Sequence, residues 1–349
     1  MLAAAQLPLR KKEIRPSVRI VLIAGKALLA IVFAVLPMAG PVQLRIVQPL
    51  MMALYVALLA DAAADAVYSI VCAVRKKERR FGMSKAVSLA CAVLFLAYGM
   101  VNMEVVTPEY HTYTSDKLTD EHKIVFVADL HVGSAQPMNV TKQTIDGIGS
   151  LHPDAIILGG DIVDDYTTAG DMAAVCRWFG DLDAPVYFIY GNHDRQGHAE
   201  YAGGRQFTPE KLEEVMANCG ITVLKDEYVR LSSDLALLGR EDISEGDARA
   251  DASELVDPFP GAYLIVADHQ PGGVKQNLVT GMDLQLSGHT HAGQLFPLRA
   301  FYQLIGYCCG DYEIDGAILN VSAGACGWRM PIRTEAHCHY EVITLKPAD

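Results

Sequence analysis

Residues 284–294 read LQLSGHTHAGQ, a short apolar run that stops at a glycine and is followed by two histidines. Four earlier apolar runs also end in residue types that bind metals. They are 124–128 before Asp129-Leu130-His131, 155–158 before Gly159-Gly160-Asp161, 186–190 before Gly191-Asn192-His193, and 263–267 before Asp268-His269. Because the carboxyl ends of adjacent strands meet at one crevice in open α/β sheets, we expect these side chains to converge there.

The pattern around these segments is that of an α/β domain. β-branched apolar runs predict strands, and the segments between the early ones predict helices. The expected strands are 124–128, 155–158, 186–190, 221–224, 235–238, 263–267, 284–287, 317–321 and 340–345, and the expected helices are 141–151, 171–182 and 209–218. Little helix separates the later strands, which suggests some antiparallel pairing.

The side chains at the strand ends are carboxylates, imidazoles and one amide, with no thiolate. This set suits Mn²⁺, Fe or Zn²⁺ and disfavours a structural zinc site built from cysteine. Each piece alone is common, since an aspartate after a strand often caps a helix and Gly-Asn-His-Asp alone is typical of a turn. The order of the segments and their shared position at strand ends indicate a metal site.

With these motifs the chain resembles the calcineurin-like binuclear metallophosphoesterases, and among them a bacterial membrane-linked branch of YkuE-type proteins. The resemblance covers about residues 120–349 and includes the segments Asn320–Gly324 and Pro331–Arg333. It implies a four-layer αββα sandwich, in which two packed sheets are covered by helices on their outer faces.

The resemblance also implies a ligand set for two divalent metal ions. One ion would be held by Asp129, His131, Asp161 and His291, and the other by Asp161, Asn192, His269 and His289. Asp161 would bridge the ions, which lie roughly 3.5–4 Å apart in such sites, and a hydroxide between them would attack the phosphate. His193 resembles the family's general acid, and Asp164 would orient it.

One position departs from the phosphoprotein phosphatases of this superfamily, which carry arginine where this chain has Asp165. Arginine there would bind a dianionic phosphate, whereas aspartate repels it. A phosphodiester carries one negative charge fewer, so the departure favours a diester substrate. We expect Asp165 and Asp194 to lie at the surface or behind the ligands, and Gln294 and Arg333 are further candidates for contact with the phosphate.

The first 105 residues are apolar and basic and predict a membrane anchor. Residues 20–36, 49–74 and 86–103 are apolar runs, which we interpret as about three transmembrane helices. A retained anchor is favoured over a cleaved signal peptide because residues 37–40 make a poor cleavage site. The expected organisation is an anchor over 1–105, a polar linker over 106–121 and the metallophosphoesterase domain over 122–349.

The basic residues predict the orientation of this anchor. They precede the first run and fill the loop at 75–80, which places both in the cytoplasm by the positive-inside rule. With three crossings the domain after residue 105 lies outside, and if the middle run does not cross, the orientation inverts. Lys26 and Asp65 would lie at similar depth near the cytoplasmic side, so we expect them to form an ion pair.

Charge is divided unevenly along the chain. Residues 1–105 carry a net +8 and residues 106–349 a net −20, for −12 overall. The acidic part would repel a phosphate backbone, which argues against nucleic acid as a partner. The eight cysteines form no Cys-x-x-Cys pair. Cys308 or Cys309 could form a disulfide with Cys326 or Cys338 if the domain lies outside.

These features predict a membrane-anchored, metal-dependent phosphodiesterase, multi-pass in the cell membrane, with an extracytoplasmic catalytic domain. The anchor favours an amphiphilic substrate, such as a lipid-linked or cell-envelope phosphate ester. The resemblance leaves open a UDP-2,3-diacylglucosamine-type pyrophosphate hydrolase, whose substrate is cytosolic. Two further alternatives are a non-catalytic, metal-stabilised module that binds envelope polymers and a transporter regulated by the domain, for which three helices are few.

Overall fold

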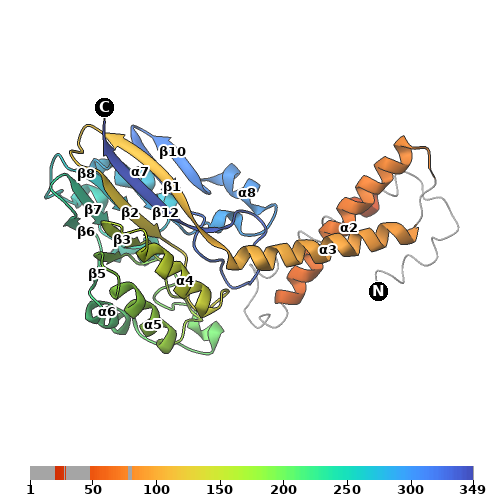
Figure 1. The fold of residues 1–349 in the computed structure, drawn as a ribbon, viewed down its shortest axis with the longest axis horizontal. Coiled ribbons are helices and arrows are strands. Elements are labelled where there is room, and N and C mark those ends of the chain that lie inside the picture. Colours follow the sequence, from red (N-terminus) through yellow and green to blue (C-terminus); the bar gives the residue numbers. More distant parts are fainter. Residues whose placement is uncertain (1–19, 27, 29–47, 78–80, 349) are drawn as a thin grey trace. The chain divides into compact units, whose positions relative to one another are not determined.

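The computed structural model describes residues 20–26, 28, 48–77 and 81–348. The chain divides into two compact units, Met1–Tyr98 and Gly99–Asp349. In Figure 1 the strands all belong to the second unit, and the long helices α2 and α3 account for most of the described part of the first.

The first unit is helical. Residues 20–26 are helical, α2 spans Gln48–Val74, and α3 spans Phe81–Glu104 and ends within the second unit. Within the described ranges, Ala57–Val74 of α2 is the one segment long and apolar enough to cross a membrane, and Ala90–Glu104 of α3 is a shorter apolar stretch. Three crossings remain a prediction, since most of the first apolar run lies outside the described residues.

Lys26 forms the expected ion pair, and it has two partners instead of one. Its Nζ lies 2.8 Å from Oδ2 of Asp65 and 2.5 Å from Oδ2 of Asp61. The two aspartates are four residues apart on α2, so they share a helix face and reach the same lysine. The pairing offsets part of the cost of placing charged groups in an apolar segment.

The second unit is built on two six-stranded sheets, in the strand orders β1-β12-β2-β3-β4-β5 and β10-β11-β9-β8-β7-β6. The strands of the first sheet are β1 (Val106–Ser115), β12 (Cys338–Pro347), β2 (His122–Val127), β3 (Ala155–Leu158), β4 (Val186–Phe188) and β5 (Ile221–Val223). Those of the second are β10 (Gly310–Ile314), β11 (Ala317–Val321), β9 (Leu284–Ser287), β8 (Tyr263–Ala267), β7 (Leu235–Gly239) and β6 (Glu227–Arg230).

Parallel pairing runs through the middle of both sheets, from β2 to β5 in the first and across β7, β8, β9 and β11 in the second. The expected antiparallel pairing occurs between β12 and β2, β10 and β11, and β6 and β7. The parallel core means that the loops after β2, β3 and β4, and those after β8 and β9, leave from the same edge of their sheets.

Helices connect these strands and cover the outer faces of the sheets. They are α4 (Met138–Gly149), α5 (Ala169–Gly180), α6 (Pro209–Asn218), α7 (Val274–Asn277) and α8 (Leu298–Ile305), with short 3₁₀ turns η3 (Ala199–Ala202), η4 (Ile243–Ala248), η5 (Ala252–Glu254), η6 (Pro271–Gly273), η7 (Leu278–Thr280) and η8 (His291–Gly293). Thr168 and Thr208 cap α5 and α6 by accepting backbone N–H bonds with their side chains.

Three apolar layers hold the unit together. Val125 and Ile156 face α4 and α5 on the outer side of the first sheet. Phe126 of the first sheet meets Leu237 of the second in the layer between the sheets, and further residues of the second sheet pack beneath α7. This is the αββα layer order expected from the sequence, because alternate residues of each strand face opposite layers.

The expected linker at 106–121 is wrong over its first ten residues, which form the edge strand β1, parallel to β12. Its polar residues made it look like a linker, but they serve a buried polar network. His111 lies 2.9 Å from Glu341 of β12, and Tyr113 donates a hydrogen bond to Asp311. Ion pairing and hydrogen bonding therefore hold β1 in the sheet, whereas the other strands are held by the packing of their apolar side chains.

Four further elements, β6, β10, α7 and α8, were not expected from the sequence. β6 and β10 are edge strands with several exposed polar residues, so they lack the apolar run that marks a buried strand. All eight cysteines are free in the structure, so the disulfide suggested for Cys308 or Cys309 is not formed.

Candidate metal centre

The loops after five parallel strands carry all seven predicted metal ligands. Asp129 and His131 follow β2, Asp161 follows β3, Asn192 follows β4, His269 follows β8, and His289 and His291 follow β9. The first three strands belong to one sheet and the last two to the other. The centre therefore forms where the carboxyl edges of the two sheets meet.

Six of the seven side chains form two groups, in each of which three ligand atoms all lie within 4.8 Å of one another. One group is Asp129, His131 and His291, and the other is Asp161, His269 and His289. Asp161 lies between the groups, because its Oδ2 is 3.3 Å from Nε2 of His269 and 3.7 Å from Nε2 of His131. This is the position that a bridging carboxylate requires.

The seventh predicted ligand, Asn192, lies beside the second group, where its Oδ1 is 2.9 Å from Nδ1 of His289. Backbone carbonyls orient two of the other imidazoles. Nδ1 of His269 faces the oxygen of Gly159 at 2.9 Å, and Nδ1 of His291 faces that of Cys326 at 3.2 Å. A hydrogen bond from Nδ1 to a carbonyl leaves the lone pair on Nε2, which in both rings points to a carboxylate.

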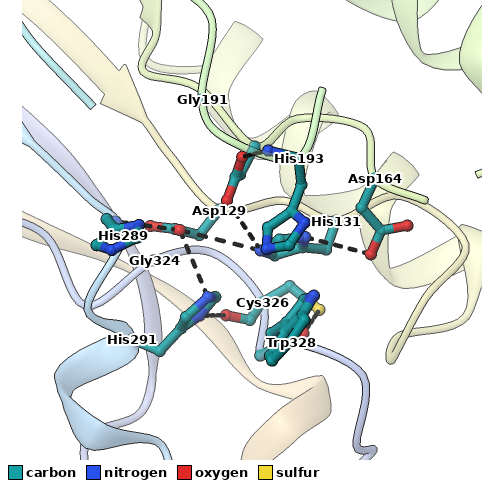
Figure 2. Close-up of polar contacts among 12 residues, drawn as sticks. Asp129, His131, Asp164, Gly191, His193, His289, His291, Gly324, Cys326 and Trp328 are labelled. Atoms are coloured by element: carbon teal, nitrogen blue, oxygen red, sulfur yellow. Dashed lines mark hydrogen bonds and ion pairs between the residues drawn. The ribbon is translucent and has the colours of Figure 1, made fainter. Parts of the chain in front are cut away.

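Figure 2 shows how closely these side chains approach. His291 points at Asp129 with its Nε2 3.5 Å from Oδ1, and its ring stacks on that of His131 with centroids 5.1 Å apart. The backbone N–H of His193 donates to Oδ1 of Asp161 at 2.8 Å, which leaves Oδ2 of that carboxylate facing the histidines.

The backbone at the centre is unusual, because five of the seven predicted ligands have positive φ. The values are 54° for Asp129, 41° for His131, 52° for Asp161, 73° for His289 and 49° for His291. Aspartate and histidine are among the non-glycine residues that adopt this conformation most readily, but it still costs free energy. The turns after the strands thus direct the predicted ligands toward one point, and the positive φ values show that this arrangement strains the backbone.

Two glycines let these loops approach each other. A Cβ at Gly191 would collide with the carboxylate of Asp161, and one at Gly288 would collide with that of Asp129. The glycines that precede Asn192 and His289 in sequence therefore make room for the carboxylates.

The donor set fits divalent cations. Nε2 of His131 and of His269 is buried and has no hydrogen-bond partner within the part of the chain that the structure describes. Burial opposes charging of His131, but Asp164 and Asp161 outweigh it and raise its pKa to about 9. Burial likewise disfavours charge on His269, yet Asp161 raises its pKa well above the usual range. Buried imidazoles facing buried carboxylates form a cluster that attracts positive charge, as a metal site must.

Comparison with known proteins agrees with this geometry. The family model of calcineurin-like phosphoesterases matches residues 122–293, which contain all seven predicted ligands. The uncharacterized metallophosphoesterase YkuE of Bacillus subtilis is 30% identical over 241 residues, which cover 65% of this chain and 80% of that protein. The chain belongs to the calcineurin-like phosphoesterase family. It is therefore a hydrolase of phosphoric esters.

The names of two other relatives of this calcineurin-like phosphoesterase refer to a membrane location and to a reaction. A transmembrane protein with metallophosphoesterase domain from Danio rerio is 26% identical over 278 residues, covering 75% of this chain and 62% of that protein. Phosphodiesterase YaeI of Escherichia coli is 31% identical over 183 residues, covering 50% of this chain and 62% of that protein. The chain thus spans less than two thirds of the length of either relative.

The carboxylate that orients His193 in this phosphoesterase is not the one expected. Asp164 instead faces Nδ1 of His131 at 3.3 Å, as Figure 2 shows. Asp165 lies 3.1 Å from Nδ1 of His193 and also accepts the backbone N–H of His198 at 2.8 Å. Consecutive residues in a turn project in different directions, and the sequence does not show which of them reaches the imidazole. Asp165 is buried and contacts the ring of His193, so of the two places expected for it, it lies behind the ligands and not at the surface.

Other expectations around the centre also change. Arg333 is fully buried and donates to the carbonyl oxygens of Cys326 at 2.9 Å and His291 at 3.1 Å, so it supports the loops and does not face a substrate. The Gln294 side chain likewise bonds backbone groups of Trp328, Met330 and Ile332. Both residues hold the segment after β11 in place.

The structure gives Asp194, which was expected at the surface or behind the ligands, a definite role, and it adds Trp328, which the sequence reasoning missed. Asp194 is buried and accepts backbone N–H bonds from Asp161, Val163 and Gly191, which ties the β3 and β4 loops together. Trp328 stacks on the ring of His193, with centroids 5.0 Å apart. The only sequence signal for the role of Trp328 was that a tryptophan occurs outside any expected strand, near the end of an acidic domain.

Proposed function

We propose that the chain is a membrane-anchored, two-metal phosphodiesterase. The observation that carries the proposal is Asp161, whose Oδ2 lies within 3.7 Å of a histidine from each ligand group. That position fits a carboxylate shared between two cations. His193 is next to it, held through its backbone N–H by Asp161 and through its ring by Asp165.

Asp129, His131, Asp161 and His291 would hold one ion, and Asp161, Asn192, His269 and His289 the other. Two such ions lower the pKa of a water molecule toward neutrality and neutralise charge on the phosphate during displacement. Mn²⁺, Fe and Zn²⁺ all suit the oxygen and nitrogen ligands. His193 donates a proton to the leaving oxygen, and Asp165 positions its ring for that transfer.

A diester substrate is supported by the charges around the centre. Asp165 places a carboxylate beside His193, and Arg333 is committed to backbone carbonyls. A phosphate with one negative charge is repelled less by such a site than a dianionic monoester is. One relative, YaeI, is named a phosphodiesterase.

An amphiphilic substrate is supported by the membrane segment. Ala57–Val74 is apolar enough to cross a bilayer, and one relative is named a transmembrane protein. We propose a multi-pass anchor with the catalytic unit outside the cytoplasm and a lipid-linked or cell-envelope phosphate ester as substrate. A cytoplasmic catalytic unit would favour a UDP-2,3-diacylglucosamine-type pyrophosphate instead.

The test is hydrolysis of bis-p-nitrophenyl phosphate by the full chain in nanodiscs, loaded with Mn²⁺, Fe²⁺ or Zn²⁺. The full chain is needed because a fragment that begins inside β1 would lose the strand beside β12. We expect diester turnover that exceeds monoester turnover and that Asp161→Asn reduces by about 10³-fold or more, since the change removes a metal-bridging charge. Gln303→Asn, on exposed α8, serves as the matched control.

The opposite result has a clear meaning. A folded chain that binds two metal ions but turns over neither ester would identify the second unit as a metal-stabilised binding module. Turnover that Asp161→Asn leaves unchanged would place the chemistry elsewhere in the molecule.

A further inference from the structure

Helix α8, Leu298–Ile305, has its apolar side on the outside. A helix on the surface of a water-soluble domain normally turns its apolar face inward. Here Phe301, Leu304 and Ile305 are 57%, 83% and 82% exposed, whereas Leu298, Arg299 and Tyr302 are half-buried. No residue of α8 is fully buried. The helix therefore presents three large apolar side chains to its surroundings.

The surface around α8 also differs in charge from the rest of the second unit. No Asp or Glu occurs from Leu284 to Gly310, nor from Ala317 to Thr334, whereas residues 106–349 carry a net −20. Arg299 lies in the first turn of α8. Nearby Glu335 interacts with Arg299, so this arginine is not a free positive charge. The exposed face of α8 itself, formed by Phe301, Leu304 and Ile305, is apolar and carries no acid, which favours contact with a lipid surface.

Within the same unit, α8 is linked to the last turn of α3. The backbone N–H of Phe296, two residues before α8, donates to Oγ1 of Thr334 at 2.9 Å. Thr334 and Ile332 in turn pack against Gly99 so closely that a Cβ there would lie under 3 Å from both, and the N–H of Arg333 donates to the oxygen of Gly99. Met100 and Val101, which follow Gly99, are 54% and 64% exposed.

We propose that the exposed face of α8, formed by Phe301, Leu304 and Ile305, docks on the surface of a lipid bilayer. The chain itself supplies the argument for this occupant. Through Thr334, the start of α8 is linked to the carboxyl-terminal part of α3, an apolar helix that follows the segment able to cross a membrane. Chain connectivity thus keeps α8 within reach of the bilayer that holds the anchor.

Docking would also fix the metal centre at that surface. His291 lies in η8, which ends at Gly293, and only Gln294–Pro297 separates it from α8. Gln294 is braced by backbone groups of the segment after β11, and the tip of that segment, Trp328, stacks on His193. The docking surface and the centre are therefore linked within one compact unit. The inference rests on the membrane anchor of the proposed function and does not depend on catalysis.

Tryptophan fluorescence tests the proposal directly. The full chain, one copy per nanodisc, is prepared as Leu304→Trp and as Val256→Trp, in phosphatidylcholine–phosphatidylglycerol with and without brominated acyl chains. Val256 is a matched control because it is apolar, equally exposed at 83% and in a loop before β8. Ile305→Trp repeats the measurement, so the result does not depend on one variant folding well.

We expect brominated lipid to quench the added fluorescence of Leu304→Trp and Ile305→Trp by about half, since an interfacial helix buries its apolar face roughly 5–10 Å deep. Val256→Trp should change no more than the parent chain. Equal quenching at 304 and 256 would overturn the proposal. So would a blue-shifted, unquenched signal at 304 and 305, which would mean that protein and not lipid covers α8.

Discussion

Asp164 and Asp165 are neighbours in sequence that contact different histidines. Asp164 faces His131, a predicted metal ligand, while Asp165 faces His193, the predicted acid. Both carboxylates are buried, and burial alone would not distinguish their roles. The contacts do, and they separate metal binding from proton transfer at the level of single residues.

Asp165→Asn should lower kcat for the diester by about 10–100-fold while leaving the number of bound metal ions at its parental value, because it loosens only the acid. Asp164→Asn should instead weaken metal affinity by about 10–100-fold through His131. Metal content by mass spectrometry and diester kinetics on both variants check this. Identical defects in the two variants would contradict the assignment.

Metal binding should be linked to pH through His131. Without metal, Asp164 and Asp161 outweigh burial and raise its pKa to about 9, so the ring is protonated at neutral pH. A metal ion must displace that proton and also one from His269, where burial disfavours charge but Asp161 raises the pKa well above the usual range. Apparent affinity should therefore rise with pH. Calorimetry in buffers of different ionisation enthalpy should show proton release at pH 7 that declines toward pH 9. Affinity independent of pH between those values would rule out this linkage.

Hydrophobic patterning predicts the strand ends, and with them the segments where metal-binding side chains should converge. The choice of ligands within those segments came from the resemblance to the family. The partners of those ligands could not be predicted in the same way. Asp194 and Trp328 act through turns and stacking, which depend on backbone dihedral angles and not on residue spacing.

At the scale of elements, β1 shows how a strand can be held by charge. Glu341 is almost fully buried on β12 and pairs with His111 of β1. Burial opposes charging of both groups, but their partners prevail. Asp311 and Glu341 raise the pKa of His111 to about 10, and His111 and His339 lower that of Glu341 to about 2. The polar residues of β1 made it resemble a linker in the sequence, and the same residues hold it against β12.

The sign of each shift sets a pH window for stability. The contribution of ionised Glu341 to the free energy of unfolding is fully present above about pH 4.5 and is lost as pH falls through about 2. That of His111 is complete below about pH 6.5 and is lost as pH rises through about 10. The pair therefore stabilises the unit most between about pH 4.5 and 6.5.

His111→Ala should lower the free energy of unfolding by about 1–3 kcal/mol at pH 6, and by less at pH 10 and above. Urea denaturation followed by the fluorescence of Trp178 and Trp328 measures this, since both report on the second unit. The control is Lys117→Ala, which breaks the more exposed pair with Asp283 and should cost below about 1 kcal/mol. An equal decrease in the free energy of unfolding for the two variants would show that the pair of His111 with Glu341 does not hold β1 in place.

For the whole molecule, the proposed anchor predicts the side of the membrane on which the second unit lies. The positive-inside rule with three crossings puts the carboxyl terminus outside. A phosphatase reporter fused after Asp349, which is active only outside the cytoplasm, should therefore be active. A fusion after residue 77, between α2 and α3, should be inactive. The reverse pattern would place the unit and its substrate in the cytoplasm.

The positive φ values at Asp129, His131, Asp161, His289 and His291 have an evolutionary consequence. Each position holds a predicted metal ligand on a backbone that glycine or asparagine would occupy at lower cost. Selection for stability and selection for catalysis therefore oppose each other at the same five codons. In a duplicated gene copy that no longer needs catalysis, substitutions to glycine and asparagine should appear first at these five positions. The thermal stability of that protein should rise as its activity is lost.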